Sequence, residues 1–336
     1  MNLRYRNFRL ADTQSCLRLL EIYPDSTARL LSQLPAFWKQ LLAEQAIIAV
    51  TIEECEPGHR PQIVGFGATV FVNEGFMREA LAAREPCLIQ RLVERELRGN
   101  GSPILRRNGI ARANAADGLN TIIVHSAPKT PLGDEPGYAY RYYLKEAIVW
   151  AHRGYRIKEG LQEVWSANDL EWIEAYLIRR SDYSEYYGRT GRPVPQHRAY
   201  LYGVSADEVL RNASSLAAPV FLYTPPRFHF SRGAQDMLAL ALDGETDIAL
   251  ANSLNVSLAT VKMRWRQIYE RIEEISPELI PEMAGKQSEA NRGKEKRRHV
   301  IEYIRNHPEE LRPFAVPRNI IPGRRSEPSI PRSVRP

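Results

Sequence analysis

The sequence predicts a mixed α/β domain, followed by a small all-α domain and a basic, partly disordered C-terminal extension. Three observations predict this class. Runs rich in β-branched residues, bounded by Pro, Gly and Asn, recur through residues 1–223. The pair Pro225 and Pro226 then breaks the chain, and short amphipathic segments with capping residues follow it. With 336 residues, the chain is long enough for one domain of about 200 residues beside a smaller one.

The N-terminal region is expected to open with an arginine-rich strand and to mix helices with strands. Its clearest elements are a helix over residues 12–23 and strands over residues 46–52, 62–72 and 119–127. Eleven of the sixteen tyrosines lie between Tyr138 and Tyr202. Amphipathic aromatic side chains can line a ligand pocket or a protein interface, or can pack the rim of an α/β core. The region is therefore interpreted as a sensory or interaction domain, with an unknown small molecule or protein as its input.

The order of an opening strand, a helix and the strand 62–72 resembles the start of a GNAT acetyltransferase, and residues 147–159 resemble a later helix of that fold and the glycine-tyrosine that follows it. The resemblance implies a glycine-rich loop after the fourth strand, where backbone N–H groups and a helix N-terminus hold the pyrophosphate of acetyl-CoA. Residues 73–90, which follow the strand 62–72, contain no such loop, and Gly99 and Gly101 are expected in a turn. The sequence thus predicts no enzyme, no catalytic residue and no cofactor. An acetyltransferase-like protein with an accessory helical domain is the alternative.

Three short helices are expected within residues 228–280. Gly244 can end the first helix in the left-handed conformation, and Asn255 supplies a tight turn into the third. Each helix can be capped at its N-terminus by a hydroxyl that accepts a hydrogen bond from the first turn, in order from Ser231, Thr246 and Ser257. This arrangement predicts a helix-turn-helix.

One set of residues within 230–272 carries a family resemblance without a gap. The set is Phe230, Ser231, Met237, Leu238, Leu240, Gly244, Leu250, Ala251, Leu254, Ser257, Thr260, Val261, Lys262 and Ile268. It resembles the LuxR-type (GerE-like) helix-turn-helix of bacterial transcription regulators. The resemblance implies a sequence-specific, DNA-binding transcriptional regulator, with the recognition helix 257–272 in the major groove of double-stranded DNA.

The third helix is expected to separate a buried face from a reading face. At 3.6 residues per turn, the buried stripe comprises Val261, Trp265, Ile268 and Ile272. The residues expected to contact DNA are Ala259, Thr260, Lys262, Met263, Arg264, Arg266 and Arg271. Lys262 is expected on a backbone phosphate, whereas Met263 and Arg266 are expected on base edges.

The segment departs from the LuxR pattern in two respects. Ala234 and Ala249 stand where the family usually carries a glutamate that completes a capping box. Pro277 and Pro281 break the stretch in which the family often forms a dimerisation helix, so a homodimer is left open. A sigma-factor-like helix-turn-helix shares the same turn and is a further alternative.

The C-terminal extension is expected in three parts. Residues 281–293 are polar and are expected to form a flexible linker, and residues 294–311 a basic amphipathic helix. Residues 312–336 hold six arginines against one glutamate, so that this tail carries nearly all of the net charge of +6. Its prolines predict an extended, disordered segment.

Other classes of function find no support in the composition. Cys16, Cys55 and Cys87 show no paired spacing, and the histidines lack the spacing of metal ligands, so no metal site is expected. No apolar run is long enough to span a membrane, and the N-terminus has no signal-peptide core. The sequence therefore predicts a cytoplasmic protein that does not contact a membrane.

Overall fold

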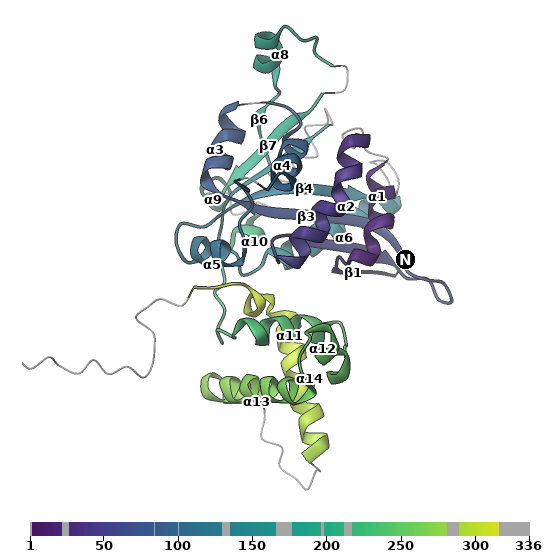
Figure 1. Cartoon of the computed structure of the whole chain (residues 1–336), viewed down its shortest axis with the longest axis vertical. Helices are drawn as coiled ribbons and strands as arrows, with labels where there is room; N and C mark the ends of the chain where they lie inside the picture. The colour runs from purple at the N-terminus through teal and green to yellow at the C-terminus, as the bar shows by residue number, and fades with distance from the viewer. Residues whose placement is uncertain are drawn as a thin grey trace, which may run out of the picture.

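The computed structural model describes residues 2–21, 27–83, 85–99, 101–129, 135–165, 177–195, 198–211, 217–280 and 289–315. An α/β domain is built on one seven-stranded sheet, and a helical unit within residues 228–311 packs beneath it in the view of Figure 1. The mixed α/β class expected for the N-terminal region is confirmed. Among the described residues, no helix combines the length and apolar character needed to cross a membrane.

The sheet has the strand order β1-β2-β3-β4-β5-β7-β6. Its strands are β1 (Leu3–Asn7), β2 (Ile48–Glu54), β3 (Gln62–Val72), β4 (Leu119–Pro128), β5 (Ile157–Val164), β6 (Ile178–Ser181) and β7 (Tyr200–Ser205). Neighbouring strands are antiparallel except β4 and β5, which run parallel. A parallel pair needs a crossover connection, and helix α6 (Glu135–His152) lies in that connection.

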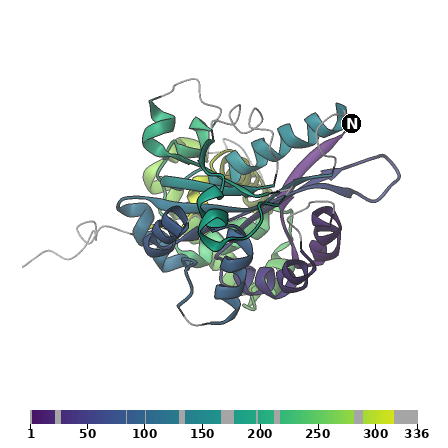
Figure 2. The same ribbon diagram turned by 90° about the horizontal axis from the view of Figure 1, so that it is seen from above.

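The remaining helices of the α/β domain surround the sheet. They are η1 (Leu10–Asp12), α1 (Thr13–Leu20), α2 (Ala28–Ala43), α3 (Glu74–Ala83), α4 (Leu88–Leu97), α5 (Arg107–Ala115), α8 (Ser184–Thr190), α9 (Ala206–Leu210) and α10 (Ala218–Phe221). The largest core cluster lies between the sheet and α1 to α4, and includes Trp38, Phe66 and Leu92. Figure 2 shows α1 and α2, in purple, on the face opposite to α6, in teal.

Helix α6 packs closely on the second face of the sheet, against β1, β2 and β3. Two glycines of β3 allow this approach. A Cβ atom at Gly67 would lie 3.1 Å from Leu144 Cδ1 of α6, and one at Gly65 would lie 2.9 Å from Ile52 Cγ1. Larger side chains at these positions would therefore push α6 or β2 outward.

The strands expected over residues 46–52, 62–72 and 119–127 are found as β2, β3 and β4, with bounds that differ by at most two residues. The place of these strands in the sheet corrects one inference from the sequence, which concerns the glycine-rich loop. The strand 62–72 is the third strand of the sheet, and the fourth is β4. The search for a glycine-rich loop in residues 73–90 therefore addresses the wrong connection, because those residues form α3 and the start of α4. Residues 147–159 comprise the end of α6 at His152, the turn with Gly154 and Tyr155, and the start of β5 at Ile157.

The helical unit has a core of its own. Its helices are α11 (Arg232–Leu242), α12 (Asp247–Ser253), α13 (Leu258–Ile275), η2 (Pro277–Leu279), α14 (Glu289–Asn306) and η3 (Pro308–Leu311). The stripe Val261, Trp265, Ile268 and Ile272 is buried, as its spacing predicts. The three hydroxyl caps also form, with Ser257 Oγ accepting from the Thr260 N–H at 3.1 Å as one example. Gly244 and Asn255 both take positive φ angles, as expected. The assignment to the LuxR type stays a prediction.

The C-terminal extension differs from its expected division. Helix α14 starts at Glu289, inside the expected linker, and residues 281–288 lie outside the described part. Val300 and Ile304 of α14 are fully buried in the core of the helical unit. Arg312, expected at the start of a disordered tail, instead lies half-buried against the α/β domain. The rest of that tail, residues 316–336, is outside the described residues.

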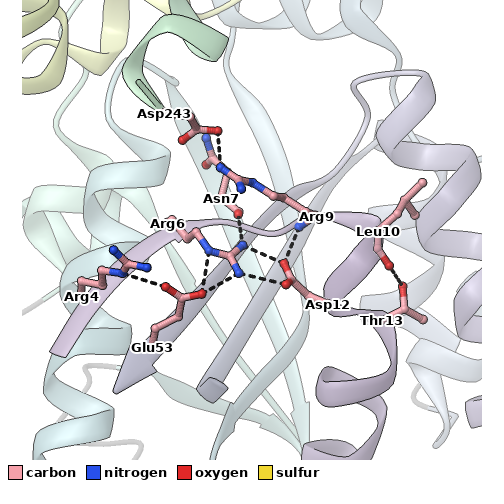
Figure 3. A network of polar contacts seen from close by, with 9 residues as sticks. All are labelled: Arg4, Arg6, Asn7, Arg9, Leu10, Asp12, Thr13, Glu53 and Asp243. Carbon is pink, nitrogen blue, oxygen red and sulfur yellow. Dashed lines mark hydrogen bonds and ion pairs between the residues drawn. The ribbon is translucent and has the colours of Figure 1, made fainter. Parts of the chain in front are cut away.

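Polar contacts join α11 to loops at one end of the sheet. Arg9 pairs with Asp243 at 2.9 Å, and Gln45 Nε2 donates to Asp236 Oδ1 at 2.9 Å. Arg107 also donates to Gln235. Figure 3 shows the Arg9 contact beside a larger network centred on the first strand of the domain.

Candidate active site

Strands β4 and β5 part toward their carboxyl ends. Their pairing runs from Leu119 opposite Ile157 to Ile123 opposite Gln162. Beyond that point, the last two residues of β5 pair with β7, and residues 124–128 of β4 keep β3 as their paired neighbour. We call this separation the β4–β5 opening. In open α/β sheets, ligands bind outside the carboxyl ends of parallel strands where the connections change direction.

Helix α6 directs its N-terminus to the same end of the sheet, because it starts shortly after β4 ends. The first turn of a helix has backbone N–H groups without helical partners and a partial positive charge, so it favours anions. Gly137 lies in that first turn and is buried. Gly133 precedes it but lies outside the described residues.

Lys129 is the exposed cation at the carboxyl end of β4. Its backbone N–H donates to Val64 O at 2.8 Å, which fixes the main chain beside β3. Its Nζ atom reaches Gln62 Oε1 only at 3.5 Å. The ammonium group is thus exposed at the carboxyl end of β4, beside the first residue of β3, and the sequence alone assigns it no role.

His125 lies on the part of β4 that β5 does not pair. Its ring packs against Trp38 and Phe66, with centroid distances of 5.7 and 5.5 Å. Burial lowers the pKa of His125 to about 3, so its imidazole is neutral at pH 7. Among the described residues, its Nε2 atom has no hydrogen-bond partner. The ring is therefore a neutral part of the aromatic core under α2.

Glu163 occupies the corresponding part of β5 and is buried. Its carboxylate accepts hydrogen bonds from the Leu88 N–H and from the Tyr183 hydroxyl, both at 2.8 Å. The first contact satisfies an N–H of the first turn of α4. Burial, together with the charge of Glu163, raises the pKa of Tyr183 well above its usual value. Glu163 thus fixes α4 and Tyr183 at the carboxyl end of β5.

The described residues form neither a metal-binding cluster nor a disulfide. No group of His, Cys, Asp and Glu side chains among them could hold a metal ion. The three cysteines form no disulfide, and burial raises the pKa of Cys16 far above its usual value.

The seven residues expected to contact DNA do not form one uniform face. Ala259, Lys262 and Met263 are exposed on α13, and Arg266 is exposed beside Glu270, 3.5 Å away. Thr260 donates its backbone N–H to the cap of its own helix. The other two arginines pack within the helical unit. The Arg264 guanidinium lies over Gly233, and Arg271 donates to Phe228 O at 3.0 Å.

Comparison with solved structures finds matches among acyl-transferring enzymes. The spermidine/spermine N-acetyltransferase SpeG from Vibrio cholerae, in mutant forms, matches 63% of this chain and 98% of its own, at 9% identity and a TM-score of 0.37. The condensation domain of Ebony, in complex with beta-alanyl-dopamine, matches 61% of this chain and 99% of its own, at 11% identity and a TM-score of 0.37. FdhC, a nucleotide-linked sugar GNAT, matches 65% and 94%, at 8% identity and a TM-score of 0.33. No substrate or mechanism carries over at such values.

Sequence comparisons find no relatives. No family model matches the chain, and no curated protein matches it. The interpretation of the protein as a DNA-binding transcription regulator that is not an enzyme is contradicted, because the structural matches are enzymes of the GNAT class and a condensation domain. The error has a physical source. The interpretation takes its function from residues 230–272, about an eighth of the chain, whereas the seven-stranded domain makes up most of the molecule. DNA contact by the seven residues stays an untested prediction.

Proposed function

We propose that the protein binds an acyl thioester of coenzyme A at the β4–β5 opening and transfers the acyl group to an acceptor. One observation carries the proposal: the only parallel strand pair of the described sheet parts at its carboxyl ends, where α6 begins. An extended ligand that contains amides can hydrogen-bond to strand backbone beyond the last paired residue. Its pyrophosphate then meets the first turn of α6 and Lys129.

The reaction is a nucleophilic substitution at a thioester carbonyl. The acceptor attacks the carbonyl carbon, the carbon–sulfur bond breaks, and the thiol of coenzyme A leaves after the acceptor has given up a proton. The role of this chain in that reaction is to align the thioester along β4 and to neutralise the phosphates. Holding two reactants in one geometry can supply about 7 to 11 kcal/mol of a barrier.

The proposal is tested by titrating acetyl-CoA and free coenzyme A into the full chain in a calorimeter. We expect both ligands to bind, and the Lys129→Glu variant to bind each roughly 5- to 10-fold more weakly, because a repulsive charge then faces the pyrophosphate. Lys145→Glu is the matched control, since this exposed lysine lies in the middle of α6. Absence of binding by the unmodified protein, or equal loss in both variants, would contradict the proposal.

A further inference from the structure

The C-terminal ends of α6 and α14 cap each other. Arg312 donates from Nε to Arg153 O at 2.9 Å and from Nη2 to Trp150 O at 3.3 Å, at the end of α6. In return, Trp150 Nε1 donates to Arg305 O at 3.2 Å and Arg153 Nη1 donates to Asn306 O at 2.9 Å, at the end of α14. The last carbonyls of a helix lack helical partners and favour a cation. Side chains at the end of α6 thus donate to the last carbonyls of α14, and Arg312, which follows α14, donates to those at the end of α6.

The segment that makes this contact, residues 305–312, is called the clasp here. It fits tightly against the turn that follows α6. A Cβ atom at Gly154, whose φ angle is +89°, would lie 2.5 Å from Glu309 Cα, so only glycine accommodates the clasp. Glu309 is buried and accepts from Arg153 at 3.1 Å. The Arg312 guanidinium lies over the Tyr155 ring, 5.0 Å from its centroid.

The clasp also holds the beginning of the helical unit. Glu310 is 1% exposed, and its carboxylate accepts from the backbone N–H groups of Arg227 and Phe228 at 2.7 and 3.0 Å. Gln235 of α11 donates to the carbonyls of Glu310 and Arg312 at 3.0 and 2.9 Å. The clasp therefore contacts α6 on one side and the helical unit on the other, and neither side can move alone without breaking these polar contacts.

Helix α6 connects the clasp to the β4–β5 opening. With 18 residues it spans about 27 Å, from its capped C-terminus to an N-terminus at the same end of the sheet as the opening, where Tyr140 donates to Glu54 at the end of β2. Its inner face is packed along its length, with Tyr140, Leu144, Ala147 and Ala151 all buried. A packed helix moves as a rigid element, so a shift at its C-terminus is transmitted to the first turn.

We infer that the clasp is a conformational device by which the helical unit controls the position of α6 and hence ligand binding at the opening. When the clasp is closed, the first turn of α6 is held for the anion; when it opens, α6 gains freedom and affinity falls. By thermodynamic reciprocity, a ligand bound at the opening also favours the closed clasp. The ligand side of this inference rests on the proposed function, whereas the coupling along α6 does not.

The test combines hydrogen exchange with calorimetry on the full chain. Arg312→Met removes the caps of α6 but keeps an apolar side chain over Tyr155. Arg305→Met is the matched control, because that side chain is exposed and only its carbonyl serves the clasp. We expect Arg312→Met to accelerate amide exchange about tenfold or more in residues 227–228, in 148–153 and also in 138–142, at the far end of α6. It should weaken coenzyme A binding about 5- to 20-fold. The control should leave both readouts unchanged.

The possible outcomes distinguish a failure of the coupling along α6 from a failure of coenzyme A binding. If exchange accelerates at 148–153 while 138–142 stays unchanged, the ends of α6 are independent and the inference is overturned. If both ends respond but the unmodified protein binds no coenzyme A, the coupling stands and the proposed function fails. Should Arg312→Met not fold, Glu309→Gln is the milder variant, because it removes the charge that pairs with Arg153 and keeps the shape. Amide exchange at residues 148–153 and at residues 138–142 then tests the inference in the same way.

Discussion

At the scale of single residues, Arg6 on β1 is the centre of a network of charged hydrogen bonds. Arg6 donates to both carboxylate oxygens of Asp12, at 2.7 and 2.9 Å, and to Glu53 on the neighbouring strand at 2.8 Å (Figure 3). Burial alone would raise the pKa of both carboxyls. The hydrogen bonds from Arg6, joined by the Arg9 N–H for Asp12 and by Arg4 for Glu53, lower the pKa of each below its ordinary value instead.

These lowered pKa values predict an acid-sensitive contribution to stability. A carboxyl with a lower pKa in the folded state stabilises the fold above its unfolded pKa, and that contribution is lost as the pH falls. We expect Arg6→Leu to lower the free energy of unfolding by about 2 to 4 kcal/mol at pH 7 and by clearly less at pH 3. Urea denaturation at both pH values measures the difference. An equal loss at pH 3 would mean that Arg6 acts through packing.

At the scale of elements, the sequence predicts what depends on neighbours along the chain. Hydroxyl caps and an apolar stripe repeat at fixed local spacing, so Ser257 and the buried face of α13 could be assigned from the sequence. The position of a strand within a sheet is not a local property. The search for a glycine-rich loop therefore falls on residues 73–90, after the third strand, and not on the segment after the fourth strand, which begins with Lys129 and includes Gly137.

The buried face of α13 gives a prediction at this scale. Trp265 is 5% exposed, its Nε1 donates to Asp247 Oδ1 at 3.2 Å, and the Arg297 guanidinium covers its ring. Trp265→Ala should destabilise the helical unit by about 3 to 5 kcal/mol, because it leaves a large cavity and removes the hydrogen bond to Asp247. Met263→Ala is the control on the exposed side, with an expected change within about 0.5 kcal/mol. Helical circular dichroism during urea denaturation compares them, and similar curves would place Trp265 outside the core.

At the scale of the whole molecule, the features hardest to predict join segments far apart in the sequence. Composition assigns Arg312 to an arginine- and proline-rich tail, whereas the structure places it on carbonyls of α6, 159 and 162 residues earlier. Nothing in the local pattern distinguishes this arginine from those that follow it. The atoms that it caps at the end of α6 are backbone carbonyls, which leave no signature in the sequence.

The position of Arg312 predicts where the chain can be shortened. A chain that ends at Ala315 keeps every contact of the clasp, so its melting temperature should equal that of the full chain. A chain that ends at Leu311 loses the caps of α6 and should melt about 2 to 6 °C lower, because hydrogen bonds to a charged group are lost. Differential scanning calorimetry decides the matter. Identical melting of both shortened chains would show that Arg312 contributes nothing.

The long separation between α6 and its cap also has a consequence during synthesis. A ribosome that adds about 5 to 20 residues per second needs roughly 10 to 30 s to pass from Arg153 to Arg312. During that interval the nascent chain already contains α6 and later all seven strands, but the end of the crossover helix has no guanidinium to close it. The cap of α6 therefore forms only after translation of Arg312, well after every strand of the described sheet has been synthesised.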